Sequence, residues 1–168
     1  WANTDQRTIE SGALLADALA PGCGIVAGHR EPGSHDPLFR PIEAGAVPFD
    51  AVAAIASIQQ QTGGPAALLQ GHAAELHALQ QILGCTQTPC DFAQMPSTLS
   101  ASANGRGLKL GGPIDLTSGT GEVLLLQYAQ GLPLSQVGWG RATPELLAQV
   151  SRLHALLFDI YARPHYMA

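Results

Sequence analysis

Few residues of this chain have both the type and the setting for chemistry, and Arg7 is the first of them. It stands in ANTDQRTIESG, at the beginning of a helical pattern. A guanidinium stays charged at acidic pH, and its planar fork of donors matches the oxygens of a phosphate group. The alternative is a surface arginine that pairs with Asp5 or Glu10. From the residues alone we prefer this alternative.

The six histidines complete no catalytic or metal-binding pattern. His35 and Asp36 are neighbours in the loop segment GSHDPLF, and we interpret Asp36 as the cap of a turn beside a solvated histidine. His72 and His77 lie five residues apart on a predicted helix and therefore on different faces, whereas zinc helices use positions i and i+4. The sequence predicts no metal site and no cofactor.

Three cysteines leave two arrangements open. Cys85 and Cys90 bracket the turn-like CTQTPC, and a disulfide across so short a ring would stabilise the fold by about 2 kcal/mol. Two unrelated buried thiols are the alternative. Cys23 is then either a free thiol or bonded to a cysteine outside this chain, and we expect the second.

Composition describes a globular chain of one core. Of the 168 residues, 46% are hydrophobic and only 12% are charged, which excludes a disordered chain. The net charge is −5 and the eight lysines and arginines are scattered, so we expect no nucleic-acid partner. No apolar run approaches the roughly 20 residues of a membrane helix. Neither an initiator methionine nor a signal-like segment opens the chain, and we expect an internal piece of a longer protein.

Apolar spacing predicts a mainly helical fold with one hairpin and one short strand. The helices are expected over residues 8–20, 50–64, 65–84, 113–131 and 143–163, with Thr143 as an N-cap. The strand is expected over residues 24–29. The hairpin is expected within residues 97–111, around the turn signal Asn104-Gly105.

Five segments then occur together in one order: ANTDQRTIESGALLADAL, DPLFRPIEAG, EVLLLQYAQG, GWGR and LHALLFDIYAR. Together they resemble the histidine acid phosphatases, most closely the bacterial periplasmic phytases and glucose-1-phosphatases. The resemblance covers residues 2–168. This family has an α/β domain with the catalytic centre and a largely helical domain inserted into it. Its R-H-G-x-R-x-P motif, with the phosphorylated histidine, and its late His-Asp motif are absent from this sequence.

The resemblance implies a particular part of that family's fold. Residues 1–30 would be a remnant of the α/β domain, and residues 31–142 would form the helical lid domain, with the hairpin at 97–111. Residues 143–168 would form a helix that returns toward the α/β domain. The expected class is therefore mainly α with a small β-hairpin.

The resemblance also implies roles for single residues. Arg7 would complete the cluster that clamps the scissile phosphate, and Glu122 would line the substrate pocket. A solvated Glu122 that stabilises a helix N-terminus is the alternative. Asn3 stands where several relatives have aspartate and would make a polar contact. Cys85 and Cys90 match a lid-domain disulfide, and Cys23 matches a cysteine whose partner lies upstream.

The implied parent is a periplasmic phosphomonoester hydrolase that works through a phosphohistidine without a metal. Its substrate would be a phosphorylated small molecule: phytate, a sugar phosphate or a phosphoanhydride. This chain alone would be inactive, and its partner would be the rest of the same polypeptide. The apolar side of residues 9–19 and 25–26 would pack on an absent sheet or, in a dimer, on a second copy.

Two interpretations outside catalysis remain. The chain could be a helical interaction or ligand-binding module that descends from such a lid. It could also be a lectin- or phosphate-binding domain that uses Glu122 and Trp139 on a pocket wall. For Trp139 itself we expect the role of a packing anchor, because tryptophan is usually well buried.

Overall fold

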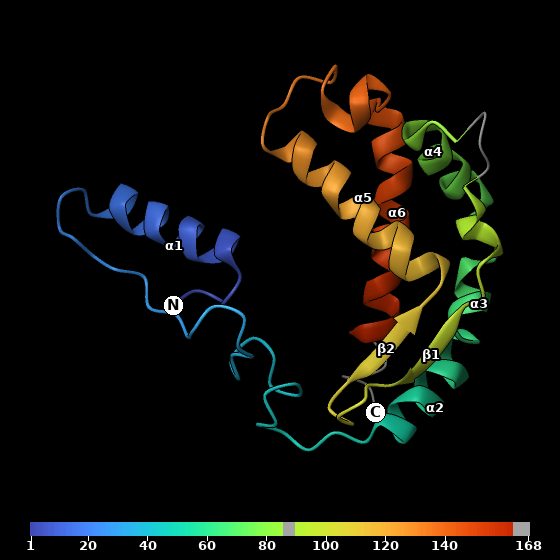
Figure 1. Cartoon of the computed structure of the whole chain (residues 1–168), viewed down its shortest axis with the longest axis horizontal. Coiled ribbons are helices and arrows are strands. Elements are labelled where there is room, and N and C mark those ends of the chain that lie inside the picture. The colour runs from blue at the N-terminus through green and yellow to red at the C-terminus, as the bar shows by residue number, and fades with distance from the viewer. Residues whose placement is uncertain (86–89, 163–168) are drawn as a thin grey trace. The chain divides into compact units, whose positions relative to one another are not determined.

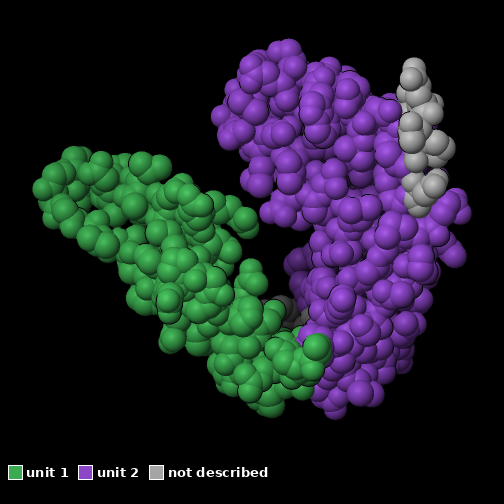
Figure 2. All heavy atoms as spheres, viewed as in Figure 1, with its two compact units in different colours: residues 1–49, 103–107 green, residues 50–102, 108–168 purple. Residues whose placement is uncertain are grey.

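The structure is a computed structural model of the 168-residue chain, and it describes residues 1–85 and 90–162. It is mainly α-helical, and two strands form the sheet of the described part (Figure 1). The chain divides into two compact units (Figure 2). The first unit comprises residues 1–49 and 103–107, and the second comprises residues 50–102 and 108–168. The mainly α class with a hairpin is confirmed, whereas the domain bounds at 30 and 142 stay a prediction about a longer protein.

The second unit contains most of the regular structure. Its elements are α2 (Ala51–Thr62), α3 (Pro65–Leu69), α4 (Ala73–Leu83), η1 (Asp91–Gln94), β1 (Thr98–Ala101), β2 (Leu108–Gly111), α5 (Pro113–Ala129), η2 (Val137–Gly140) and α6 (Pro144–Tyr161). Helices α5 and α6 lie side by side, and α4 packs on α6 (Figure 1). Its core consists of side chains with almost no solvent exposure, namely Ile58, Leu79, Ile82, Ile114, Val150, Leu153 and Ile160.

Close contact between α5 and α6 depends on small residues of α5. A Cβ at Gly121 would lie 3.0 Å from Cγ1 of Val150 on α6. The buried Ser118 hydroxyl is 3.1 Å from Nδ1 of His154 across the same interface. Gly121 in the stretch before Glu122 therefore serves helix packing, and the buried Ser118 hydroxyl is bonded to α6. The buried Thr117 hydroxyl has no hydrogen-bond partner among the described residues.

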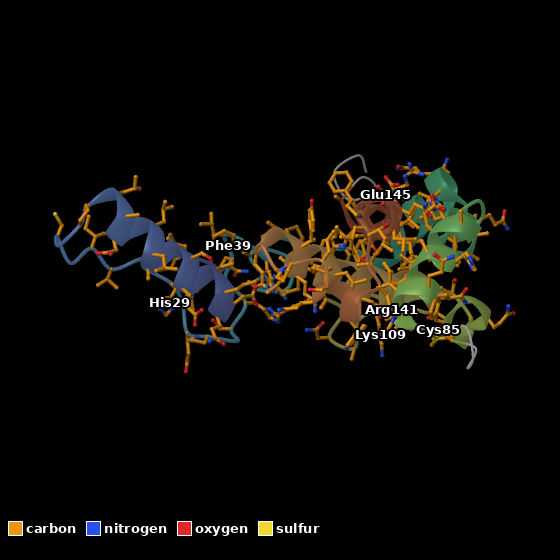
Figure 3. The ribbon with its side chains drawn as sticks, turned by 90° about the horizontal axis from the view of Figure 1, so that it is seen from above. His29, Phe39, Cys85, Lys109, Arg141 and Glu145 are labelled. Atoms are coloured by element: carbon orange, nitrogen blue, oxygen red, sulfur yellow. A yellow bond between two sulfur atoms is a disulfide. The ribbon has the colours of Figure 1, made fainter. Side chains whose placement is uncertain are left out.

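Helix ends follow local side-chain chemistry. Asp50 Oδ1 accepts hydrogen bonds from the amides of Val52 and Ala53, and α2 is followed by its C-cap Gly63, whose φ is 74°. Thr143 caps α6 by accepting from the Leu146 amide, as predicted. Glu145 lies in the first turn of α6 (Figure 3), where hydrogen bonds from its own backbone amide and from Thr143 lower the pKa of its carboxyl.

The predicted hairpin is confirmed. Strands β1 and β2 are antiparallel, with Thr98 opposite Gly111 and Ala101 opposite Leu108. At the turn, Asn104 Oδ1 accepts a hydrogen bond from the Arg106 amide at 3.0 Å. This side-chain bond is what makes asparagine followed by glycine a turn signal.

Two expected elements are wrong in detail. Residues 65–84 do not form one helix, because α3 ends at Leu69 and α4 begins at Ala73, with Gly71 at a φ of 89° between them. Residues 24–29 are extended but form no strand. The backbone of this segment is joined to residue 2 by the bond from the Ala2 amide to the Gly28 carbonyl at 2.8 Å, and one such bond makes no ladder.

In the first unit, α1 (Gln6–Leu19) is an amphipathic helix without a buried residue. Leu14, Leu15 and Leu19 are 60–77% exposed on it. Cys23, four residues beyond the helix, is an exposed free thiol in this chain. The apolar side of α1 is therefore open to solvent within its own unit.

Backbone strain is concentrated at η2. Gly138, Trp139 and Gly140 follow one another with φ values of 53°, 57° and 75°, and Trp139 is the one non-glycine residue with positive φ in the part of the chain described. A left-handed backbone costs a non-glycine residue about 1–2 kcal/mol. The Gly138 amide donates to Gln127 Oε1 at 3.0 Å, and Val137 is fully buried, so both hold this turn to the core.

The sequence predicts that Trp139 is a packing anchor, but the prediction is wrong because this residue is 69% exposed. The Arg141 guanidinium lies 5.3 Å from the centre of its ring. An exposed pair of this kind contributes about 0.5–1 kcal/mol, which is less than or comparable to the backbone strain. Packing within the chain therefore does not explain why this strained position carries tryptophan.

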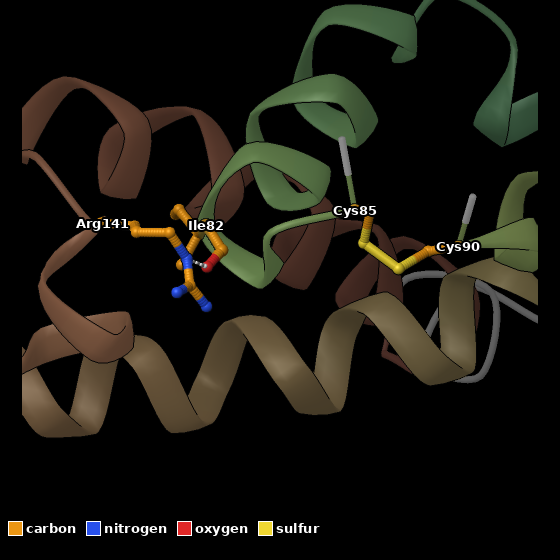
Figure 4. The surroundings of a disulfide bond; sticks show 4 residues. All are labelled: Ile82, Cys85, Cys90 and Arg141. Atoms are coloured by element: carbon orange, nitrogen blue, oxygen red, sulfur yellow. Dashed lines mark hydrogen bonds between the residues drawn. A yellow bond between two sulfur atoms is a disulfide. The ribbon is translucent and has the colours of Figure 1, made fainter. Parts of the chain in front are cut away.

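The Cys85–Cys90 disulfide joins the end of α4 to the beginning of η1 (Figure 4). Its Cα atoms are 5.5 Å apart, within the ordinary range. Of the two arrangements that the sequence left open, the structure has the bonded one. The bridge spans five positions along the chain, so it restricts only a short loop of the unfolded protein.

Gly138→Ala is expected to lower the free energy of unfolding by about 2–4 kcal/mol. The new Cβ would lie 2.5 Å from Cγ2 of Ile82, on a left-handed backbone. Gly119→Ala on α5 is the matched control, because its Cβ would meet nothing within 4 Å, and it should raise that free energy by about 0.5–1 kcal/mol. Urea denaturation measures both changes, and equal effects would contradict this account of η2.

Cys85→Ser with Cys90→Ser is expected to lower the free energy of unfolding by about 2 kcal/mol through the larger entropy of the unfolded chain. Treatment with dithiothreitol should have the same effect on the original chain and none on the double variant. Cys23→Ser is the control, because this cysteine is exposed and unbonded. A thermal unfolding curve that does not respond to dithiothreitol would refute the structural role of the bridge.

Candidate phosphate-binding site

Arg7 is the second residue of α1, so its guanidinium belongs to the positive end of a helix dipole. Asp5 is the N-cap residue, and its backbone carbonyl accepts from the amides of Thr8 and Ile9 at 3.0 and 3.1 Å. The Asp5 side chain makes no capping bond to the helix. An uncapped helix N-terminus beside an arginine is a suitable place for an anion.

The Asp5 carboxylate is held by two other groups. Its Oδ2 accepts from Asn3 Nδ2 at 3.0 Å and lies 4.0 Å from Nη2 of Arg40. The nearby Glu10 accepts from Gln6 Nε2 at 2.8 Å. The two carboxylates that the sequence offered as partners of Arg7 therefore both bind other side chains as well.

The side-chain amide of Asn3 donates a hydrogen bond through its nitrogen but accepts none from the described residues through its oxygen. Its Oδ1 atom is buried and has no hydrogen-bond partner within the described ranges of the chain. The Thr8 hydroxyl binds the carbonyls of Asn3 and Asp5 at 2.8 and 2.7 Å and so fixes the turn between them. Asn3 and Arg7 both lie near the N-terminal end of α1, and their roles in substrate binding stay a prediction.

Asp36 organises the loop that carries Arg40. Its carboxylate accepts from Trp1 Nε1 and from the Leu38 amide, both at 2.8 Å, and Arg30 Nε lies 4.0 Å away. The hydrogen bond from Trp1 lowers the pKa of this carboxyl the most, and the bond from Leu38 lowers it further. The Asp36 carbonyl accepts from the Arg40 amide at 2.7 Å. Asp36 is therefore a turn cap, as interpreted from the sequence.

Neither His35 nor His29 belongs to a catalytic pair. His35 is exposed beside the buried Asp36. His29 is exposed in the extended segment after α1 (Figure 3), and its Nδ1 contacts the Arg30 carbonyl at 2.7 Å. No group of three or more His, Cys, Asp or Glu that could hold a metal occurs among the residues described.

Glu122 belongs to the second unit, whereas Arg7 and Asn3 belong to the first. It is half-buried on α5, which begins at Pro113, so Glu122 stands in the middle of the helix. The alternative of a glutamate that stabilises a helix N-terminus is therefore wrong. The substrate-pocket role of Glu122 stays a prediction.

Each unit also has a hollow that the sequence did not suggest. In the first unit, a groove of about 350 Å³ lies between α1 and residues 25–28, with Trp1 on its wall. In the second, a pocket of about 440 Å³ is lined by leucines of α4 and α5, by Phe92 and Met95, and by two threonines of α5. The walls of both hollows are predominantly apolar.

None of the described helices is long and apolar enough to cross a membrane.

Sequence reasoning missed Arg40 as a second guanidinium at this end of α1. Its signal was present in the segment DPLFR, where Arg40 follows the turn cap Asp36 by four residues. Only the folded turn brings its Nη2 atom to Asp5. Asp5 and Arg40 are 30 or more residues apart in the sequence, and no local pattern predicts their contact.

Comparison with known proteins gives homologues of one kind, although no family model matches the chain. Phytase AppA of Escherichia coli K12 is 34% identical over 156 residues, which are 84% of this chain and 35% of that protein. The glucose-1-phosphatase of Providencia rettgeri is 27% identical over 159 residues, 91% of this chain and 37% of that protein.

Solved phytase structures agree with the fold. Hafnia alvei phytase in complex with tartrate superposes with a TM-score of 0.83 at 34% identity, over 99% of this chain and 43% of that one. Citrobacter braakii phytase superposes with a TM-score of 0.82 at 31% identity, over 97% and 41%. The chain spans about two fifths of the length of these proteins. It is a homologue of bacterial phytases and glucose-1-phosphatases and belongs to the histidine acid phosphatase family.

Proposed function

We propose that this chain is part of a phosphomonoester hydrolase in which Arg7 binds the scissile phosphate. The observation that carries the proposal is the position of Arg7 at the uncapped N-terminus of α1 in a homologue of phytases. A guanidinium donates two parallel hydrogen bonds to phosphate oxygens, and the helix end adds its dipole. Each such bond contributes about 1.5–3 kcal/mol to binding.

The residues around Arg7 support this role. The Asp5 carboxylate, which would repel a phosphate, is bound by Asn3 and by the Arg40 guanidinium 4.0 Å away. The open Oδ1 atom of Asn3 can accept a hydrogen bond from a substrate hydroxyl. Arg7 would then contact the phosphate, and Asn3 would make the polar contact to the rest of the substrate.

The proposed reaction needs groups that these 168 residues do not contain, because the sequence has no R-H-G-x-R-x-P motif. A histidine elsewhere in the longer protein would attack phosphorus while Arg7 holds the nonbridging oxygens. An aspartic acid would protonate the leaving group, and water would then hydrolyse the phosphohistidine. As charge spreads over the equatorial oxygens, the fixed guanidinium would stabilise the transition state more than the substrate. The route uses no metal and no cofactor.

Glu122 is proposed to select substrates rather than to react with them. A half-buried carboxylate in a phosphate-binding protein repels phosphoryl groups, so its use lies in accepting hydrogen bonds from substrate hydroxyls. Relatives are named for phytate and for glucose 1-phosphate. Glucose 1-phosphate has free ring hydroxyls, and phytate gains them as its phosphates are removed. We propose phytate, sugar phosphates or phosphoanhydrides as the substrate class.

A periplasmic location is proposed on the chemistry of Cys85 and Cys90. Their disulfide persists in oxidising compartments such as the bacterial periplasm and is rare in the cytosol. Cys23 is proposed to pair with a cysteine of the longer protein, since its thiol is exposed in this chain.

The apolar side of α1 is proposed to be covered by the rest of the polypeptide. Leu15, Leu19, Ile25 and Val26 line the groove of the first unit, and each is at least 58% exposed. A second copy of the chain on the same face is the alternative occupant. A non-catalytic module that is complete by itself, the alternative function, is expected to have a closed core and not to expose this apolar face.

Arg7→Ala in the longer protein is expected to lower kcat/KM for p-nitrophenyl phosphate by about 10²–10³-fold, because a donor to the transition state is lost. Arg7→Lys should retain part of the activity, since it keeps the charge without the fork. Lys109→Ala, which removes an exposed cation from β2, is the matched control and should have no effect.

The 168-residue chain alone should not hydrolyse p-nitrophenyl phosphate above the rate in buffer. Enzyme-like turnover by this chain, or an Arg7→Ala protein with undiminished kcat/KM, would refute the proposal. Failure of the longer protein to fold is separated from loss of the donor by comparing the circular dichroism of the two Arg7 variants.

Leu15→Glu with Leu19→Glu is expected to abolish most binding of the apolar dye ANS to the chain alone, because both residues line the exposed groove. Val52→Glu is the control, since Val52 is 78% exposed but lies on α2 in the other unit. The longer protein should bind little ANS. Sedimentation velocity measures whether the chain dimerises. If ANS binding falls as the dimer forms, a second copy of the chain is the occupant of the groove.

A further inference from the structure

The turn at η2 presents an aromatic ring in a way that its own packing does not require. Trp139 is held on a left-handed backbone between two glycines, and 69% of its surface is exposed. A glycine at this position would relieve the backbone, so the choice of tryptophan concerns its ring. Strain of this kind is typical of sites where a ligand is bound.

The backbone of the turn is also closely packed. Gly138 is buried against Ile82, Leu124 and Ala142, where any Cβ would lie within 3.3 Å of their side chains. A Cβ at Gly140 would lie 2.9 Å from the Ser135 carbonyl oxygen. The backbone that carries the indole is therefore held by its packing, which reduces the entropy lost when a ligand binds to the ring.

A guanidinium is fixed next to this ring. Arg141 Nε donates to the Ile82 carbonyl at 2.7 Å, and the guanidinium lies 5.3 Å from the centre of the Trp139 ring. Figure 4 shows the two Nη atoms of Arg141 directed away from Ile82. No carboxylate in the described part of the chain forms an ion pair with Arg141. Its Nη donors remain available for an anion from outside.

We propose that Trp139 and Arg141 form a surface site for a pyranose ring that carries an anionic group. The exposed indole stacks on the apolar C–H face of the ring, and the Arg141 guanidinium binds its carboxylate or phosphate through two parallel hydrogen bonds. The site is on the surface, so the hydroxyl groups at the edge of the sugar stay in water. A purely apolar ligand would leave the guanidinium unused.

This site shares no residue with the proposed phosphate site at Arg7. It lies in the second unit, whereas Arg7 lies in the first. It also differs from the pocket beside the disulfide, whose lining includes neither Trp139 nor Arg141. The two proposals therefore rest on different residues and are tested with different variants.

The test uses the 168-residue chain labelled with 5-fluorotryptophan, whose two tryptophans give two fluorine NMR signals. Trp1→Phe assigns them. Addition of D-glucuronate is expected to shift the Trp139 signal saturably and to leave the Trp1 signal in place. D-glucose, with the ring but no charge, should bind about tenfold more weakly. Acetate, with the charge but no ring, should give no saturable shift. Glucose 1-phosphate separates phosphate from carboxylate as the preferred anion.

Three variants separate binding from folding. Trp139→Gly should raise the midpoint of thermal unfolding, because it relieves the left-handed backbone. It should also abolish glucuronate binding, which saturation-transfer NMR of the ligand measures without a tryptophan signal. Arg141→Gln should weaken glucuronate binding about tenfold and leave glucose binding unchanged. Arg7→Ala should leave both unchanged. An unmoved Trp139 signal, or undiminished glucuronate binding by Trp139→Gly, would overturn the proposal, as would a shift that depends only on protein concentration.

Discussion

The anion-binding end of α1 depends on how the acidic side chains around it are neutralised. Asp5 lies two residues before Arg7 and would ordinarily cap the helix. Here it is bound by Asn3 and lies close to Arg40, so the helix amides have no side-chain cap. Because a capping carboxylate and a phosphate would compete for the same donors, this displacement of Asp5 is the condition for the proposed phosphate site.

Arg40 reaches Asp5 only because Asp36 fixes the turn that carries it. Asp36 is almost fully buried, and a buried carboxylate is stable only when its oxygens accept hydrogen bonds. The Trp1 indole and the Leu38 amide supply those bonds. The first unit is therefore held together by polar contacts across its loops, whereas its one helix buries none of its apolar side chains.

The second unit is stabilised in the opposite way. Its core of leucine, isoleucine and valine lies between α4, α5 and α6, and small residues on α5 let α6 approach closely. Such a rigid body can hold a strained turn, because the buried residues on both sides of Trp139 determine its backbone. The structural difference between the units matches the proposed functions: a unit that needs a further partner and a unit that can present a ligand site by itself.

Local chemistry was enough to predict much of the fold. The cap Thr143 and the turn at Asn104 act through hydrogen bonds to amides two or three residues away, so their effect is readable along the chain. The break at Gly71 was missed because periodic apolar residues continue on both sides of it, and periodicity does not report backbone φ. The expected strand over residues 24–29 failed because a strand needs a paired neighbour, which no local pattern supplies.

The sequence by itself determined the helical class, the hairpin and the Thr143 cap, because each depends on residue type and short spacing. The family followed from the resemblance of five ordered segments, and that resemblance also suggested the disulfide and the role of Arg7. Tertiary structure alone decided that Arg40 meets Asp5, that Asp36 binds Trp1, and that Trp139 is exposed rather than buried. These contacts join residues far apart in the chain or depend on which side chains surround a turn. Their energies arise only when the core has brought those segments together, and so they leave no periodic trace in the sequence.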